Sequence, residues 1–137
     1  MKISEIVRVD SRGRILIPSS VRSALALREQ AYVMLIADLE SREVRLIPFA
    51  DPEAKLYELR ITIDDAPGAL AKAALKLAEL GVDLLSTQSR TLYRRKMAEW
   101  FIVADLSKCK VKPVKLEKYL KEEGVASRVE VRPLSSL

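Results

Sequence analysis

A break in pattern about a third of the way along the chain most constrains how this sequence can fold. Short β-rich segments precede the break and longer alternating elements follow it, with Pro48 and Pro52 standing close together between them. Proline ends regular strands and restricts the residue before it, so this clustering favours a linker. We therefore expect two domains, residues 1–50 and 56–137, joined by a linker at 51–55.

The first domain has the pattern of short strands around one short helix. The expected elements are a strand at 3–9, a turn at 10–13, a strand at 14–17, a helix at about 20–26, and a hairpin with strands at 31–37 and 43–48. About 50 residues cannot bury a sufficient core without a disulfide or a metal. The chain has one cysteine, Cys109, so an internal disulfide is excluded.

A second copy of the chain is the remaining way to cover the apolar side chains of the first domain. We expect two copies to interleave and to bury the alternating apolar residues Ile15, Ile17, Val33, Leu35, Val44 and Leu46. The expected assembly is an obligate homodimer or a higher homo-oligomer.

Positive charge is densest at the N-terminal end. The chain carries a net charge of +5, and residues 1–28 hold six cations against two anions. Four of these cations surround the first turn and helix, namely Arg8, Arg12, Arg14 and Arg22. One such arginine is typical of a solvated charge at a turn. Four together favour double-stranded DNA, because cations that neutralise phosphates release counterions.

The same region carries a specific motif. It contains Val9-Asp10, then Gly13-Arg14-Ile15-Leu16-Ile17-Pro18, then a helix with Arg22 and Leu25. Over residues 3–50 the chain resembles the AbrB-type (SpoVT/AbrB, MazE-like) swapped-hairpin DNA-binding domain. The resemblance implies a small, mostly-β, dimerising domain in which Arg14 and Arg22 contact DNA and Arg8 and Arg12 add contacts.

The chain departs from this family at three positions. Ser20 and Ser23 stand where the family often has an acidic residue and a second arginine. Ala26 stands in place of a frequent glycine. These departures affect the expected number of base contacts more than the expected fold.

The second domain has longer elements. We expect a strand at 56–63, a helix at 69–80, strands at 82–93 and 97–106, a helix at 113–123 and a strand at 125–131. This β-α-β-β-α-β order is the α+β ferredoxin-like arrangement.

The loop before the first helix of this domain offers partners for both ends of a zwitterion. Gly68 lets a ligand approach the backbone, and the helix start offers N–H groups to a carboxylate. Asp64 or Asp65 could take an ammonium group. Alternatively, Asp65 only caps the helix and Gly68 only permits helix–sheet packing.

The loop also belongs to a longer motif. It reads Asp65-Ala66-Pro67-Gly68-Ala69-Leu70 and is followed later by Gly81-Val82-Asp83. Residues 56–132 thus resemble an ACT domain, a regulatory module that commonly binds amino acids, often between two subunits. The resemblance implies an effector site made by Asp64, Asp65, Pro67, Gly68, Ala69, Leu70, Val82 and Asp83.

Together these features predict a transcriptional regulator whose DNA affinity is set by a small effector, an amino acid by analogy. An antitoxin with a similar DNA-binding head is the alternative, although such proteins usually end in a flexible acidic tail and this C-terminus is mildly basic. We expect no enzyme, cofactor or metal site: the chain lacks histidine, a nucleophile–base set and a Walker loop.

Composition also bears on the setting of the protein. No apolar run reaches the roughly 20 residues that span a bilayer, and the first residues lack a signal-peptide core. With a single cysteine, this favours a cytoplasmic protein without a membrane partner. The absence of asparagine beside abundant arginine, lysine and glutamate is typical of thermophile proteins.

Overall fold

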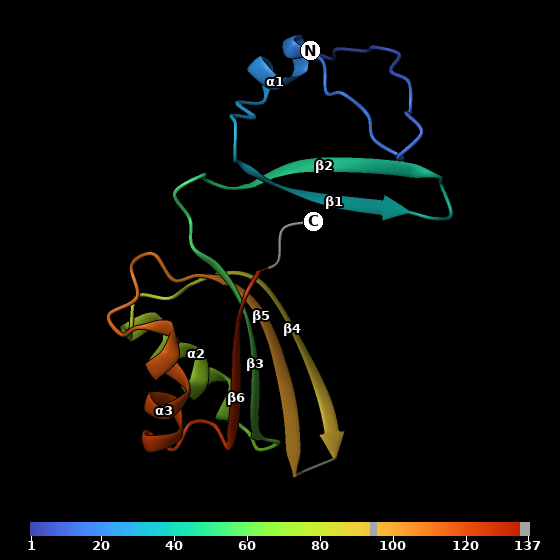
Figure 1. The fold of residues 1–137 in the computed structure, drawn as a ribbon. Coiled ribbons are helices and arrows are strands. Elements are labelled where there is room, and N and C mark those ends of the chain that lie inside the picture. The colour runs from blue at the N-terminus through green and yellow to red at the C-terminus, as the bar shows by residue number, and fades with distance from the viewer. Residues whose placement is uncertain (94–95, 135–137) are drawn as a thin grey trace. The chain divides into compact units, whose positions relative to one another are not determined.

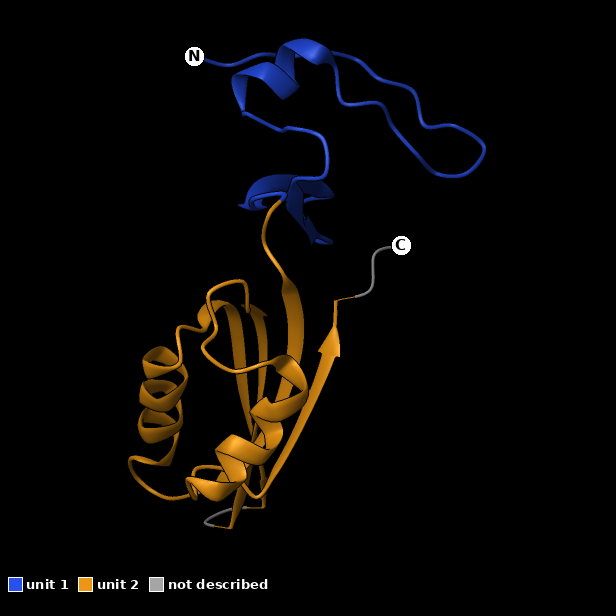
Figure 2. Cartoon of the chain, turned by 60° about the vertical axis from the view of Figure 1, so that its left-hand side comes forward, with its two compact units in different colours: residues 1–52 blue, residues 53–137 orange. Residues whose placement is uncertain are grey.

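The computed structural model describes residues 1–93 and 96–134. Over these residues the protein is small and mostly β, with six strands in two antiparallel sheets and three helices (Figure 1). The chain divides into two compact units, residues 1–52 (unit 1) and 53–137 (unit 2), shown in Figure 2. The division falls inside the linker that the sequence predicts at 51–55.

Unit 1 contains one short helix and one hairpin. Its elements are α1 (Ser19–Ala24), β1 (Tyr32–Asp38) and β2 (Glu43–Ala50). The two strands pair antiparallel, with Leu35 opposite Leu46 and Ala37 opposite Val44. These opposed side chains share one face of the hairpin, which is therefore apolar.

The strands predicted at 3–9 and 14–17 are wrong for the single chain, because neither segment forms a regular strand. Between them only a turn closes, in which the Asp10 N–H donates to Arg14 O at 2.9 Å and the Gly13 N–H donates to Asp10 O at 3.1 Å. A strand needs a neighbour to accept its backbone hydrogen bonds, and the described chain supplies none to these segments.

Unit 1 has no core. None of residues 1–52 is buried, and the apolar face of the hairpin stands open: Leu35 is 63% exposed and Val44 is 60% exposed. A folded domain normally buries side chains of this kind. Unit 1 thus leaves the apolar face of its hairpin exposed to solvent.

Unit 2 has the predicted element order. It contains β3 (Leu56–Asp64), α2 (Ala69–Glu79), β4 (Asp83–Tyr93), β5 (Met97–Asp105), α3 (Pro113–Glu122) and β6 (Arg128–Pro133). The strands form one sheet in the order β4-β5-β3-β6, with antiparallel neighbours. Both helices lie on the same face of this sheet (Figures 1 and 2).

The core of unit 2 lies between the sheet and the two helices. Helix α2 contributes Ala73 and Leu77, and α3 contributes Leu116 and Leu120; all four are at most 1% exposed. Every second residue of the central strands faces these helices, Ile61 and Ile102 among them. The other sheet face carries the alternate residues and is uncovered in the described chain. No helix among the described residues is long and apolar enough to cross a membrane.

Candidate nucleic-acid interface and effector loop

Asp10 organises the arginine turn of unit 1. Its Oδ1 accepts the backbone N–H of Arg12 at 2.8 Å and that of Arg14 at 2.9 Å. Its Oδ2 accepts the Arg14 Nε–H, also at 2.9 Å. Gly13 has φ +76°, the left-handed conformation that glycine adopts without strain. The turn is therefore held by one carboxylate and one glycine.

These contacts keep the Asp10 carboxylate ionised. The N–H groups of Arg14 and Arg12 lower its pKa below the ordinary value, and the Arg14 side chain adds to the effect. Sequence reasoning treated Asp10 only as part of a motif. An aspartate four residues before an arginine, across a glycine turn, is the signal that identifies it as the residue that holds the turn.

The four predicted DNA-contacting arginines are all exposed. Arg14 is fixed by Asp10 through Nε, and its side chain is still 69% exposed. The Arg22 guanidinium donates to the backbone oxygen of Ile17. Within the described residues, the side chains of Arg8 and Arg12 make no hydrogen bond or ion pair. Two guanidinium groups are thus oriented by the protein, and two are available to any anion.

A further contact joins the N-terminal segment to α1. The Ser20 hydroxyl donates to the Glu5 carboxylate, across 15 residues of sequence. Ser20 is one of the positions that departs from the AbrB-type pattern. Here the serine links the segment that carries Arg8 to the helix that carries Arg22.

The predicted effector loop lies at the start of α2. Asp64 ends β3 and is exposed, and the Asp65 N–H donates to Lys96 O at 3.2 Å. Gly68 precedes the helix with φ +85°, and a Cβ placed on it would meet nothing within 4 Å. The left-handed backbone conformation therefore favours glycine at this position. Helix–sheet packing does not require a glycine here, because a side chain would find open space beside the backbone.

Pro67, Ala69 and Leu70 lie with Gly68 at the start of α2, whereas the other two predicted effector residues, Val82 and Asp83, follow its end. The helix has 11 residues, and at 1.5 Å of rise per residue it separates Gly68 from Val82 by about 16 Å. Val82 is 6% exposed and packs in the core of unit 2, while Asp83 is exposed at the start of β4. One chain therefore does not bring Val82 and Asp83 to the loop.

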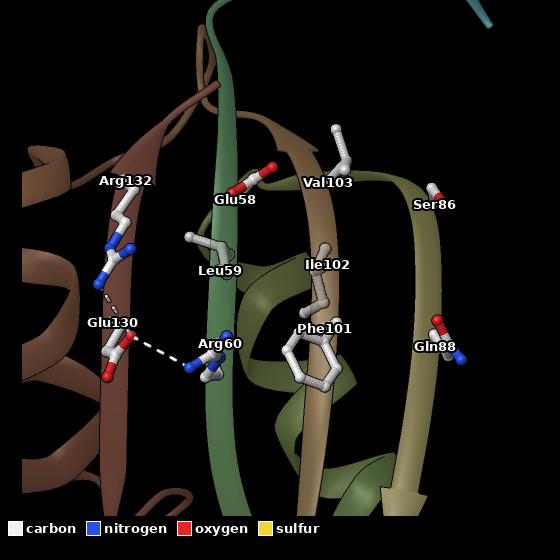
Figure 3. A pocket seen from close by; sticks show the side chains of 10 residues that line it. All are labelled: Glu58, Leu59, Arg60, Ser86, Gln88, Phe101, Ile102, Val103, Glu130 and Arg132. Carbon is white, nitrogen blue, oxygen red and sulfur yellow. Dashed lines mark ion pairs between the residues drawn. The ribbon is translucent and has the colours of Figure 1, made fainter. Parts of the chain in front are cut away.

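Sequence reasoning missed a cavity of about 280 Å³ on the uncovered sheet face of unit 2 (Figure 3). Its lining includes Glu58, Arg60, Phe101, Glu130 and Arg132. The available signal was the alternation of charge with apolar residues along β3 and β6, which places charged residues on one face. Among the described residues, no group of three or more acidic or cysteine residues could hold a metal ion.

No protein-family model matches this chain, and a comparison with curated proteins gives no significant match.

Proposed function

We propose that this protein is a dimeric DNA-binding transcriptional regulator. Its head is an AbrB-type swapped hairpin built from two copies of unit 1. Unit 2 is an ACT-like, ferredoxin-like module that binds a small effector, an amino acid, and thereby sets DNA affinity.

One observation carries the proposal: an exposed, organised arginine turn stands on a unit with no buried residue. The missing core supports a head completed by a second copy, because an apolar hairpin face as open as this one is unfavourable in water. Two copies would provide eight arginines for DNA. Arginine can donate two hydrogen bonds to the edge of a guanine or can contact a phosphate. The turn therefore suits both base-specific and backbone contacts to a duplex.

The separation of the effector residues supports a dimeric sensor. The loop at Gly68 and the strand start at Asp83 lie at opposite ends of α2, so a single site can include both only if they come from different copies. An effector bound between copies would favour one arrangement of the two modules over another, and such a preference is what couples effector to DNA.

DNA binding is tested with the full chain and a labelled random-sequence duplex, by fluorescence anisotropy over a range of salt concentrations. Arg12→Ala is the sharpest variant, because this side chain has no hydrogen bond or ion pair with any described residue that the substitution could disturb. In a dimer it should reduce the salt slope by about one to two, and weaken binding at every salt concentration. Lys115→Ala in α3 removes an equal charge from an exposed position of unit 2 and should leave both quantities unchanged.

An Arg12→Ala titration that matches that of Lys115→Ala contradicts the placement of DNA on this turn. If neither the wild-type chain nor either variant binds duplex at low salt, the DNA-binding proposal is itself wrong.

Effector binding is tested by calorimetry of the full chain against each of the twenty amino acids. The expected result is one or a few binders whose heat is lost in Asp64→Asn and kept in Glu122→Gln, an exposed control on α3. The absence of binding heat with all twenty amino acids would contradict an amino-acid effector.

A further inference from the structure

The uncovered sheet face of unit 2 has a regular arrangement of charge around one aromatic ring. Strand register places Phe101 of β5 opposite Arg60 of β3 on one side and opposite Gln88 of β4 on the other. Glu130 of β6 lies opposite Arg60 and completes this row across the sheet. Figure 3 shows the four side chains on one level of the sheet. Phe101 is therefore the apolar centre of a polar face.

Most charges on this face are paired within the unit. Glu130 lies 3.8 Å from Arg60, 3.0 Å from Arg128 and 3.6 Å from Arg132. Arg60 also lies 3.4 Å from Glu99, and its guanidinium stands 5.0 Å from the centroid of the Phe101 ring. Two carboxylates thus offset most of the charge of three arginines. The small net charge that remains would release few counterions from a polyanion, so this face fits nucleic acid poorly.

Two charged groups that flank Phe101 have no ion-pair partner among the described residues. Glu58 is exposed and makes no ion pair. Arg90 is exposed and lies opposite Glu99 in register without an ion pair to it, and its guanidinium stands 5.7 Å from the centroid of the Phe101 ring. Asp64, at the end of β3 on the same face, is also exposed and unpaired among the described residues. Beside Phe101 itself, the face thus presents one unpaired negative charge and one unpaired positive charge.

Register places these two charges on opposite sides of Phe101. Strands β3 and β4 run in the same direction, because both are antiparallel to β5. Glu58 comes two residues before Arg60, and Arg90 comes two residues after Gln88, so the two lie diagonally across the ring. Consider a two-fold axis in the plane between two such faces that passes over Phe101 and is perpendicular to the line from Glu58 to Arg90. This axis brings Glu58 of each copy opposite Arg90 of the other.

The connection between the two units of one chain is short. Asp51 pairs with Arg28 of unit 1 at 3.5 Å. The Lys55 N–H donates to Asp105 Oδ1 of unit 2 at 3.0 Å, and Lys55 O accepts from the Leu106 N–H at 2.9 Å. Only residues 52–54 remain between these anchors, and each spans at most about 3.6 Å. If two copies are joined at unit 1, each unit 2 is held near the other at an effective concentration on the order of millimolar.

We propose that the uncovered sheet face of unit 2 docks on the same face of a second copy, with Phe101 at the axis and Glu58 paired with Arg90 across it. The proposal rests on the dimeric head proposed above. Docking covers the Phe101 ring and pairs the two unpaired charges beside it, so the centre of the face is complementary to itself.

The test is chemical cross-linking of the full chain in a Cys109→Ser background. Gln88→Cys places a thiol beside Phe101, and Lys118→Cys places a matched thiol on α3, where its side chain is 79% exposed and on the covered side of the sheet. A short bismaleimide should link Gln88→Cys chains into dimers several-fold faster than Lys118→Cys chains. Equal rates overturn the docking.

Charge exchange then tests the pairing. Glu58→Arg or Arg90→Glu alone sets like charges opposite each other and should bring the Gln88→Cys rate down to the control rate. The double variant Glu58→Arg with Arg90→Glu restores opposite charges and should restore the rate. A double variant that stays at the control rate overturns the pairing.

Sedimentation of the same samples separates the two proposals. A monomeric chain contradicts the dimeric head of the proposed function. A dimeric chain without preferential linking at Gln88→Cys contradicts the docked sheet face alone, and leaves the head intact.

Discussion

Unit 2 buries a continuous core between its sheet and two helices, whereas unit 1 buries none of its side chains. The contrast is clearest in two leucines: Leu35 of β1 is 63% exposed and Leu75 of α2 is 61% exposed. Leu75 lies on the outer side of a helix whose buried face, at Ala73 and Leu77, is already packed. Leu35 lies on an entirely apolar hairpin face that packs against no other described element. Similar exposure thus has different meanings in a unit with a core and in a unit without one.

The largest expected effect tests whether unit 2 is stable by itself. Leu116→Ala removes a fully buried side chain of α3 and should lower the free energy of unfolding by about 2 to 5 kcal/mol. Denaturant titration followed by fluorescence measures this unit alone, because Trp100, the only tryptophan, is buried in its core. Val114→Ala, at a position 85% exposed, should change the midpoint little. A midpoint that is unchanged in Leu116→Ala would contradict the role of this core.

The next effect distinguishes the two leucines directly. Leu35→Asp should convert the dimer to monomer and abolish DNA binding, because burying a leucine contributes about 1.5 to 3 kcal/mol and an unpaired carboxylate opposes burial. Leu75→Asp should leave both properties unchanged. Sedimentation and anisotropy measure the two outcomes. A dimeric Leu35→Asp chain would show that the hairpin face is not the contact between heads.

A smaller effect concerns the end of α1. Ala26 has φ +53°, its N–H donates to Ser23 O, and the Leu27 N–H donates to Arg22 O at 2.9 Å, which together form a Schellman motif with alanine at the glycine position. Ala26→Gly should therefore stabilise unit 1 by about 1 kcal/mol. Ala24→Gly, inside the helix, should destabilise it by a similar amount.

Hydrogen exchange of the Leu27 amide measures both glycine variants. Exchange should slow in Ala26→Gly and quicken in Ala24→Gly. Faster exchange in Ala26→Gly would contradict the left-handed cap.

The smallest effect concerns the pKa of Asp10. The backbone N–H groups of Arg14 and Arg12 are the main cause of the lowered pKa. Arg14→Ala keeps both N–H groups and should therefore leave this pKa below the ordinary value. Since the folded pKa is depressed, the contribution of the turn to stability is present at neutral pH and is lost only as the pH falls below about 4. A carbon-detected NMR titration of the carboxyl measures the value. A return to the ordinary pKa in Arg14→Ala would assign the effect to the ion pair instead.

Local pattern predicted unit 2 well. Helical spacing and the glycines at 81 and 124 placed α2 and α3 within a residue of their observed ends. The last strand was predicted at 125–131 but runs from Arg128 to Pro133. Val125 packs in the core, but it precedes Arg128, where pairing with β3 begins. Its hydrophobicity therefore led to a predicted strand start that is three residues too early.

Local pattern failed at the N-terminus for a different reason. The segments at 3–9 and 14–17 have strand-like composition, yet a strand exists only where another strand accepts its hydrogen bonds. The turn between them was predicted correctly, because Asp10 and Gly13 act on residues two to four positions away.

The sequence by itself determined the turns, the ends of α2 and α3, the order of elements in unit 2 and the position of the arginines, because these depend on neighbours within one or two turns of chain. Only the tertiary structure decided which apolar residues find a core. It also decided that α2 separates the Gly68 loop from Asp83, and that Glu58 and Arg90 lie on opposite sides of Phe101. Burial and strand register join residues far apart in the chain, so no local pattern contains them.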